Sequence, residues 1–162
     1  MLARLDDGHE LPVRLVDIDD LVHLAVERQR RTHPELVVDR TAVGAGQVRG
    51  DEVLLAQVVG NLLANAARHA RSRVAVSLAE EGGRVVLAVD DDGPGIAPQD
   101  RARVFDRFVR LDEARARDAG GVGLGLAIVS DVVGLHGGTV HVERAPLGGA
   151  RFVVDLPAAG GD

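Results

Sequence analysis

The chain has 162 residues, enough for one domain with a hydrophobic core. Its formal net charge of -6 argues against a nucleic-acid partner, because nucleic-acid binding needs a basic surface. It has no cysteine, which excludes disulfides and Cys-ligated metals and agrees with a cytoplasmic setting. All 19 basic residues are Arg, so a lysine-containing phosphate loop and a Schiff-base lysine are excluded. No apolar run approaches the roughly 20 residues that span a bilayer.

Periodicity and turn residues predict an alternation of helices and strands. The residue before Pro34 avoids the helical region, so the first long helix is predicted to end near His33. Gly82 and Gly83 predict a hairpin turn between two strands. In chain order we expect an extended piece at 11–15, a helix at 17–33, a strand at 35–39 with a short partner strand at 47–49, a helix at 51–70, strands at 74–78 and 85–89, a short helix at 98–103, a mobile loop at 111–120, a helix at 123–135, and strands at 139–143 and 150–156.

This order of elements predicts an α+β fold. The strands cluster in antiparallel pairs and the helices are few, unlike a βαβ repeat. We therefore expect a two-layer sandwich in which helices cover one face of a single mixed, mostly antiparallel sheet. Residues 1–8 are typical of the end of a longer helix, and residues 158–162 are predicted to form a disordered tail.

The first glycine cluster follows a predicted central strand. Asp91 ends that strand, and its carboxylate could accept a hydrogen bond from an exocyclic amine such as that of adenine. Gly93 and Gly95 would let a flat ring lie against the backbone. An isolated Asp-x-Gly-x-Gly pattern is more often a turn with a solvated carboxylate, so this motif by itself does not establish a nucleotide site.

The second glycine cluster opens an apolar helix. Gly121, Gly123 and Gly125 suit phosphate binding through backbone N–H groups and the helix dipole. The cluster is not the dinucleotide fingerprint, because position 126 is Leu and a charged segment precedes it.

Asn61 and Asn65 project from one face of the helix predicted at 51–70, since four residues separate them. Their amide oxygens are suitable donors for Mg²⁺, and two amides that cap or bridge core backbone are the alternative. Arg68 could contact phosphate, and Arg107 and Arg110 could fold over the phosphates, unless they are ordinary surface charges. The histidines show no metal-ligand spacing.

Four segments in this order resemble the catalytic, ATP-binding domain of bacterial sensor histidine kinases. That domain belongs to the Bergerat-fold superfamily that includes the ATPase domains of gyrase, Hsp90 and MutL. Residues 61–69 (NLLANAARH) resemble its N box, 91–95 (DDGPG) its G1 box, 104–110 (VFDRFVR) its F box, and 121–129 (GVGLGLAIV) its G2 box. The resemblance covers residues 16–156, and the F box separates histidine kinases from the other branches.

The resemblance implies a role for each matching residue. Asn65 would ligate Mg²⁺ that bridges the ATP phosphates, with Asn61 beside it, and Asp91 would bind the adenine amine. The residues implied to take part in catalysis are Asn61, Arg68, Arg107 and Arg110, of which the last two would belong to an ATP lid. The nucleotide-binding set implied by the family is Asn65, His69, Asp91, Gly93, Gly95, Ile96, Gly121, Gly123, Leu124, Gly125 and Leu126.

Asn61 also has a mechanistic consequence. Hydrolytic relatives carry Glu at this position to activate water, and an amide cannot act as a general base. The resemblance therefore implies slow ATP hydrolysis and transfer of the γ-phosphoryl group to a histidine on a dimerisation hairpin, for relay to an Asp of a response regulator. The alternatives are a stand-alone serine protein kinase of the anti-sigma type and a nucleotide-binding module without transfer.

The acceptor histidine is expected to lie outside this chain. His9 begins a sequence like the acceptor motif, but Pro12 breaks the helix which that motif needs. Residues 1–15 are expected to be the end of the hairpin and a linker, and 16–157 the catalytic domain. We expect a cytoplasmic domain without self-phosphorylation, anchored to a membrane only through segments outside this chain.

Overall fold

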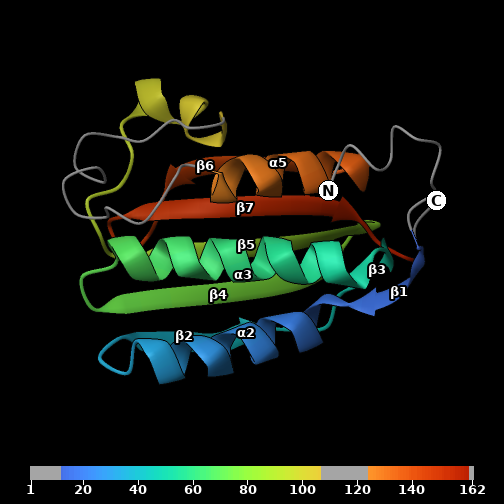
Figure 1. The fold of residues 1–162 in the computed structure, drawn as a ribbon, viewed down its shortest axis with the longest axis horizontal. Helices are drawn as coiled ribbons and strands as arrows, with labels where there is room; N and C mark the ends of the chain where they lie inside the picture. Colours follow the sequence, from blue (N-terminus) through green and yellow to red (C-terminus); the bar gives the residue numbers. More distant parts are fainter. Residues whose placement is uncertain (1–11, 107–123, 161–162) are drawn as a thin grey trace.

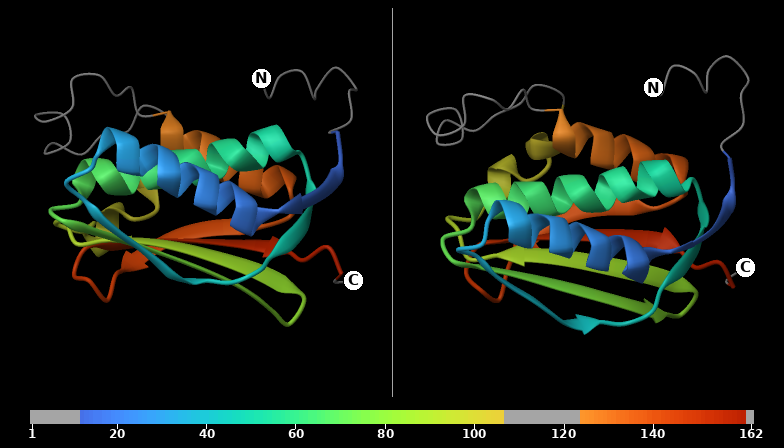
Figure 2. Two further views of the ribbon diagram at one scale, coloured as in Figure 1. Left: turned by 90° about the horizontal axis from the view of Figure 1, so that it is seen from below. Right: turned by 60° about the horizontal axis from the view of Figure 1, so that its bottom comes forward.

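A computed structural model describes residues 12–106 and 124–160 of the chain. In this part, α-helices cover one face of a five-stranded sheet, and a two-stranded sheet lies at one end (Figures 1 and 2). The helices are α2 (Ile18–Thr32), α3 (Glu52–His69) and α5 (Gly125–Leu135), with 3-10 helices η1 (Pro98–Asp100) and η2 (Arg103–Phe105). The strands are β1 (Arg14–Asp17), β2 (Val37–Val43), β3 (Gln47–Gly50), β4 (Arg73–Glu81), β5 (Arg84–Asp91), β6 (Thr139–Arg144) and β7 (Ala150–Pro157).

The large sheet has the strand order β2-β4-β5-β7-β6, with β2 parallel to β4 and the other pairs antiparallel. Side chains alternate between its two faces. Val89 is paired with Phe152, and both are buried in the core under the helices. Asp91 lies two positions beyond Val89 and therefore on this same face, whereas Asp90 and its partner Arg151 lie on the other one.

Helix α3 is the centre of the helical layer. The Oδ1 of Asp51 accepts the N–H of Leu54 at 3.0 Å, which satisfies one of the free donors at the helix start. Each fully buried Leu or Val on this helix contributes about 1.5–3 kcal/mol through the loss of apolar surface from water. Its buried apolar residues are Leu54, Leu55, Val58, Val59, Leu62, Leu63, Ala66 and Ala67.

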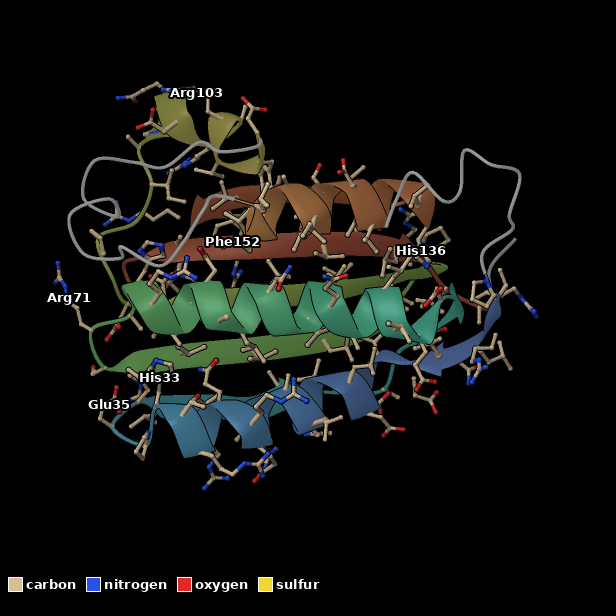
Figure 3. All side chains as sticks on the ribbon, viewed as in Figure 1. His33, Glu35, Arg71, Arg103, His136 and Phe152 are labelled. Carbon is tan, nitrogen blue, oxygen red and sulfur yellow. The ribbon has the colours of Figure 1, made fainter. Side chains whose placement is uncertain are left out.

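His136 connects the end of α5 to the start of α3 (Figure 3). Its Nε2 lies 3.1 Å from the backbone nitrogen of Asp51, and its Nδ1 lies 2.8 Å from the carbonyl oxygen of Val132. A carbonyl can only accept and a backbone N–H can only donate, so the ring proton is on Nδ1. A Cβ at Gly50 would overlap this ring.

The predicted α+β sandwich is confirmed, with helices on one face of a mostly antiparallel sheet. The prediction of a single sheet is wrong. Residues 47–50 pair antiparallel with β1 in a separate sheet, and β2 instead runs parallel to β4. The cause is long-range: α2 returns the chain so that β2 reaches β4, a crossover that local periodicity does not show. The short helix expected at 98–103 is two 3-10 turns.

The start of the expected disordered tail is ordered. Ala158 is 4 % exposed, and its N–H donates to the carbonyl oxygen of Gly83 at 2.9 Å. The N–H of Ala159 donates to the carbonyl oxygen of Gln47 at 2.8 Å, so both residues belong to the packed domain. The expectations for residues 1–8 and 111–120 lie outside the described residues. Among the helices that the structure describes, none is long and apolar enough to cross a membrane.

Candidate functional site

Asp91 is the central polar residue of the site. It ends β5 on the helix-facing side of the sheet and is 2 % exposed. Its Oδ1 accepts the N–H of Gly93 at 2.9 Å and the N–H of Ala150 at 3.3 Å. Burial raises the pKa of Asp91 above its usual value, and these two hydrogen bonds act in the opposite direction. The backbone thus holds one carboxylate oxygen in a fixed position.

Two glycines, Gly93 and Gly149, lie against this carboxylate, and Gly95 lies beside Gly149. A Cβ at Gly93 would overlap the main-chain carbonyl oxygen of His69, and one at Gly149 would overlap the Oδ1 of Asp91. Gly95 has a φ of +76°, a conformation that favours glycine. The backbones of the α3 end, the β5 end and the β6–β7 turn therefore meet at Asp91 in a way that only glycine permits at these positions.

Asp92 fixes the loop that follows α3. Its Oδ1 accepts the N–H groups of Arg71 (2.8 Å) and Ser72 (3.1 Å), and its Oδ2 accepts the hydroxyl of Ser72 (2.8 Å). Burial alone would raise the pKa of Asp92, but hydrogen bonds from Ser72, Arg73 and Arg71 outweigh it and lower the pKa to about 2. Asp92 is thus ionised at neutral pH and holds the end of α3 against the end of β5.

Asn61 and Asn65 lie on the side of α3 that faces α5. The Nδ2 of Asn61 donates to the carbonyl oxygen of Gly125 at 3.2 Å, which joins α3 to the first residue of α5. Asn65, one turn later, is 7 % exposed. Arg68 is exposed on the following turn. Asn61 therefore lies at the approach between α3 and the start of α5, with Asn65 and Arg68 on the following turns of the same helix.

The segment between β5 and α5 is anchored by apolar contacts. Ile96 packs against the core, and its carbonyl oxygen accepts the Nε of Arg101 at 3.1 Å. The ring of Phe105 meets that of Phe152 edge to face, with 6.0 Å between centroids and an interplanar angle of 84°. Such aromatic pairs add about 0.5–1.5 kcal/mol beyond burial.

A family model described as histidine kinase-, DNA gyrase B-, and HSP90-like ATPase matches residues 50–160. The chain belongs to this ATPase family.

Curated relatives of this ATPase domain are named as a sensor protein and as sensor-like histidine kinases. The chain is 46 % identical to the sensor protein RstB of Escherichia coli over 135 residues, which cover 83 % of this chain and 31 % of RstB. It is 40 % identical to the sensor-like histidine kinase SenX3 of Mycobacterium bovis over 162 residues, which cover 97 % of this chain and 40 % of SenX3. The chain therefore spans about a third of the length of these relatives.

Solved structures agree with the family assignment. The mycobacterial sensor histidine kinase MprB superposes with a TM-score of 0.80 at 37 % identity, covering 90 % of this chain and 97 % of that one. The ATP binding domain of PrrB from Mycobacterium tuberculosis superposes with a TM-score of 0.76 at 34 % identity, covering 91 % and 98 % of the two chains. Identity, fold and coverage thus point to the same family.

The ATPase domain brings several of the residues singled out in the sequence into contact. Asn61 binds Gly125, His69 packs on Gly93, and Gly93 binds Asp91. Leu126 packs against the core, while Leu124 precedes the helix start. Arg107, Arg110, Gly121 and Gly123 lie outside the described residues.

Sequence reasoning missed the contribution of the β6–β7 turn. Gly149 and Ala150 contact Asp91 from 58 and 59 positions further along the chain, and the Gly149 N–H also donates to the Asp91 carbonyl oxygen at 3.2 Å. The only signal was a pair of adjacent glycines, which by itself predicts a turn.

The donor groups present determine which cation the site could hold. No group of three or more His, Asp or Glu residues that could hold a metal ion occurs within residues 12–106 and 124–160. The amide oxygens of Asn61 and Asn65 are hard donors that suit Mg²⁺, which keeps several waters and takes phosphate oxygens as further ligands. The donor set of this ATPase domain therefore fits Mg²⁺ bound together with a nucleotide.

Proposed function

We propose that this chain binds ATP with Mg²⁺ and presents the γ-phosphoryl group to a histidine on a dimerisation hairpin outside the described fold. From that histidine the phosphoryl group passes to an Asp of a response regulator. The observation that carries the proposal is the buried carboxylate of Asp91, held by the backbone of Gly93 and Ala150 at the strand end. Membership of the ATPase family supports the choice of ATP.

Adenine recognition follows from the chemistry of Asp91. An ionised carboxylate accepts hydrogen bonds only, so it selects a ring that presents an exocyclic amine over one that presents a carbonyl. Because Asp91 is almost fully buried, a ligand without that amine would cover the carboxylate without adding a hydrogen bond to those from Gly93 and Ala150, which is costly. The site therefore favours the amine that adenine carries at C6 over the carbonyl that guanine carries at the same ring position.

The phosphates would lie between α3 and the start of α5. Asn65 supplies an amide oxygen to Mg²⁺, which when bound would neutralise phosphate charge. Arg68 adds a cation on the same helix, and the N-terminus of α5 presents the backbone N–H groups of its first turn, which Leu124 does not cap with its side chain. Arg107, Arg110, Gly121 and Gly123 are proposed to complete the phosphate contacts as a lid and a glycine-rich turn.

Asn61 determines which acceptor can receive the phosphoryl group. Its Nδ2 donates to Gly125, so the side chain orients the start of α5. An amide cannot take a proton from water at neutral pH, so the site has no general base there for hydrolysis. Phosphoryl transfer then depends on positioning and on electrostatic stabilisation of an external nucleophile, and an imidazole nitrogen can attack without prior proton removal.

The curated relatives favour a histidine kinase over the two other candidate functions. A stand-alone serine kinase would transfer to a hydroxyl, whereas the matching curated proteins are named sensor proteins and histidine kinases. A binding module without transfer would keep Asp91 and Asn65, so transfer itself must be measured. We also propose that the longer protein is a membrane-anchored sensor with this domain in the cytoplasm.

Nucleotide binding can be tested with one variant and a neighbouring control. Asp91→Asn turns an acceptor-only group into one that also donates, so we expect ATP affinity to fall about 10–100-fold by calorimetry. Asp90→Asn makes the same chemical change one residue away, on the opposite face, where Asp90 binds Arg151 through both oxygens at 2.8 Å. We expect this control to keep its ATP affinity. Equal affinities for ATP in wild type and Asp91→Asn would refute the assignment.

Transfer is tested by adding ATP labelled at the γ-phosphate to the chain alone and to the chain with an isolated dimerisation hairpin. The expected result is acid-labile, base-stable label on the hairpin histidine. Label on a serine would indicate the serine kinase. Tight ATP binding with no label on any acceptor would leave a nucleotide-binding module.

A further inference from the structure

A groove of about 990 Å³ lies between α2 and α3 and is lined by residues of both helices. The two helices lie side by side over the same face of the sheet (Figures 1 and 2). Its floor is made of small residues, among them Ala25 on α2 and Ala56, Gly60 and Ala64 on α3. Small residues allow the backbone of a third helix to approach closely. A stripe of small residues does not by itself define a binding site. The polar groups along the groove are therefore needed to identify what binds there.

Gln29 supplies the first independent observation. It lines the groove, is 5 % exposed, and carries the one buried side-chain polar atom without a partner within residues 12–106 and 124–160. That atom is Nε2, a donor of two hydrogen bonds. A buried donor left unpaired costs about 1–3 kcal/mol. The atom is covered in the free chain, so a carbonyl or carboxylate oxygen of an occupant would satisfy it once the Gln29 side chain turns toward the groove.

Charge supplies the second observation. Arg28 and Arg68 line the groove, and none of the described lining residues is Asp or Glu. The whole chain carries a formal charge of -6, so a cationic groove without acidic residues differs from the average surface. Val53 adds an apolar side chain that is 75 % exposed at one end. The groove thus combines cations, an unpaired donor and an apolar contact.

We propose that this groove docks an acidic amphipathic helix of a partner protein. The apolar stripe of that helix would lie on the small residues and on Val53, in the manner of a helix in a groove. Its carboxylates would meet Arg28 and the Nε2 of Gln29. Such a charge arrangement sets specificity and association rate more than it sets affinity.

The docking groove is separate from adenine recognition but adjoins the proposed phosphate region. Asn61 and Arg68 lie where the groove borders the α5 side of α3, whereas Asp91 does not line it. A bound helix would therefore lie beside the nucleotide. Arg68 is common to both proposals, but docking does not depend on ATP binding, because Arg28, Gln29 and the small residues take no part in the proposed nucleotide contacts.

The test uses two model peptides of about 18 residues, roughly five helical turns, with the same alanine and leucine stripe. One carries Glu on both flanks and the other carries Lys. A third peptide has the acidic composition with two prolines, which prevent a helix. Binding to the wild-type chain is followed by fluorescence anisotropy, and the site by amide chemical shifts. We expect the acidic helix to bind about tenfold more tightly than either control peptide, with shifts on α2 and α3.

Substitutions place the peptide in the groove. Gly60→Gln fills the floor, where a Cβ meets nothing within 4 Å, and should weaken binding about tenfold. Gly134→Gln on α5, where a Cβ also meets nothing, is its matched control. Arg28→Glu should reverse the preference between the two charged helices. Arg49→Glu makes the same charge change on β3, outside the groove, and should leave the preference unchanged.

Gln29→Leu separates docking from a purely structural role. Removal of an unpaired buried donor should raise the melting temperature of the free chain. If Nε2 binds the partner, the same variant should bind the acidic helix several-fold more weakly. Asp91→Asn should bind the peptide as wild type does, which keeps this proposal distinguishable from failure of the nucleotide site.

Three results would overturn the proposal. The first is equal binding of the acidic, basic and proline-containing peptides. The second is an effect of Gly60→Gln no larger than that of Gly134→Gln. The third is tight, Arg28-dependent binding of phosphatidylserine vesicles or duplex RNA without preference for the acidic helix, which would indicate a general polyanion surface.

Discussion

The main-chain carbonyl oxygen of His69 lies so close to the Cα of Gly93 that a Cβ at position 93 would overlap it. His69 is the last residue of α3, and Gly93 follows β5. Close backbone approach, and not a positive φ, is thus the physical reason for glycine at this place. The contact sets the distance between the helix with the asparagines and the strand with Asp91.

Gly93→Ala should damage both stability and nucleotide binding. The added methyl group must push α3 away from the turn, which costs about 1–3 kcal/mol by overpacking. It also displaces the N–H that donates to Asp91 at 2.9 Å. We expect ATP affinity to fall about tenfold or more and the free energy of unfolding to fall, measured by calorimetry and urea denaturation. Gly160→Ala, where a Cβ meets nothing within 4 Å, is the control. An alanine variant at 93 with normal affinity would contradict the close contact.

Gly148 and Gly149 are neighbours, but different physical constraints favour glycine at the two positions. A Cβ at Gly149 would overlap the Oδ1 of Asp91, so Gly149→Ala should displace the carboxylate and abolish measurable ATP binding. Gly148 has a φ of +105° but open space around it. Gly148→Ala should therefore cost about 1–3 kcal/mol of stability through backbone strain and leave ATP affinity within about twofold. Equal loss of affinity in the two variants would show that the turn, and not the contact with Asp91, matters.

Asp92 should protect the domain against acid. Its folded-state pKa of about 2 lies below the usual 3.8, so folding favours the ionised carboxylate. Its contribution is complete above pH 3.8 and is lost as the pH falls through the folded pKa near 2. Asp92→Asn keeps one acceptor but loses the charge and the bond from the Ser72 hydroxyl. We expect it to lower stability by about 1–3 kcal/mol at pH 6. In urea titrations, the difference in the free energy of unfolding between wild type and Asp92→Asn should become smaller toward pH 2. A constant difference across that range would contradict the coupling between folding and ionisation of Asp92.

The contribution of Asp91 to stability should depend on pH in the opposite direction to that of Asp92. Burial raises its folded-state pKa, so folding favours the protonated carboxyl. The stability it contributes is present at low pH and lost as the pH rises through the folded pKa. At neutral pH the ionised carboxylate of Asp91 therefore lowers the stability of the protein without ligand. Asp91→Asn should raise the melting temperature at pH 7 while it weakens ATP binding, a trade between stability and function. A lower melting temperature at pH 7 would indicate that the carboxylate is stabilising without ligand.

Gly60 and Gly50 should respond in opposite ways to the same substitution. Gly60 lies inside α3 with nothing within 4 Å of a Cβ, so Gly60→Ala should stabilise the helix by up to about 1 kcal/mol. A Cβ at Gly50 would overlap the ring of His136. Gly50→Ala should break the bond between the Asp51 N–H and Nε2 of His136 and destabilise the domain by about 1–3 kcal/mol. Thermal unfolding of both variants tests the prediction, which fails if Gly50→Ala is as stable as wild type.

Much of the fold follows from local sequence features. The hairpin at Gly82 and Gly83 forms as expected, with both glycines at positive φ. The helix predicted at 51–70 is observed at Glu52–His69, because its apolar spacing and the cap at Asp51 are local properties. The four motifs and their order predicted the ATPase family, which the family model then matched.

Long-range pairing could not be predicted from the sequence alone. The antiparallel pairing of β1 with β3 and the parallel pairing of β2 with β4 depend on how α2 crosses the sheet. Local patterns report which face of a strand is buried, but they do not report which strand lies beside it. For the same reason β3 was assigned to the wrong partner.

By itself the sequence determined the residue types of this protein: Asp91 at a strand end, Asn61 and Asn65 one turn apart, and glycines where backbone must pass closely. Only the tertiary structure decided which of these groups meet. It placed Gly149 and Ala150 against Asp91. It also placed Gln29, whose Nε2 has no hydrogen-bond partner within the described residues, beside a cationic groove. The physical reason is that side-chain chemistry and backbone propensity are local, whereas burial and hydrogen-bond partners arise from contacts between distant parts of the chain.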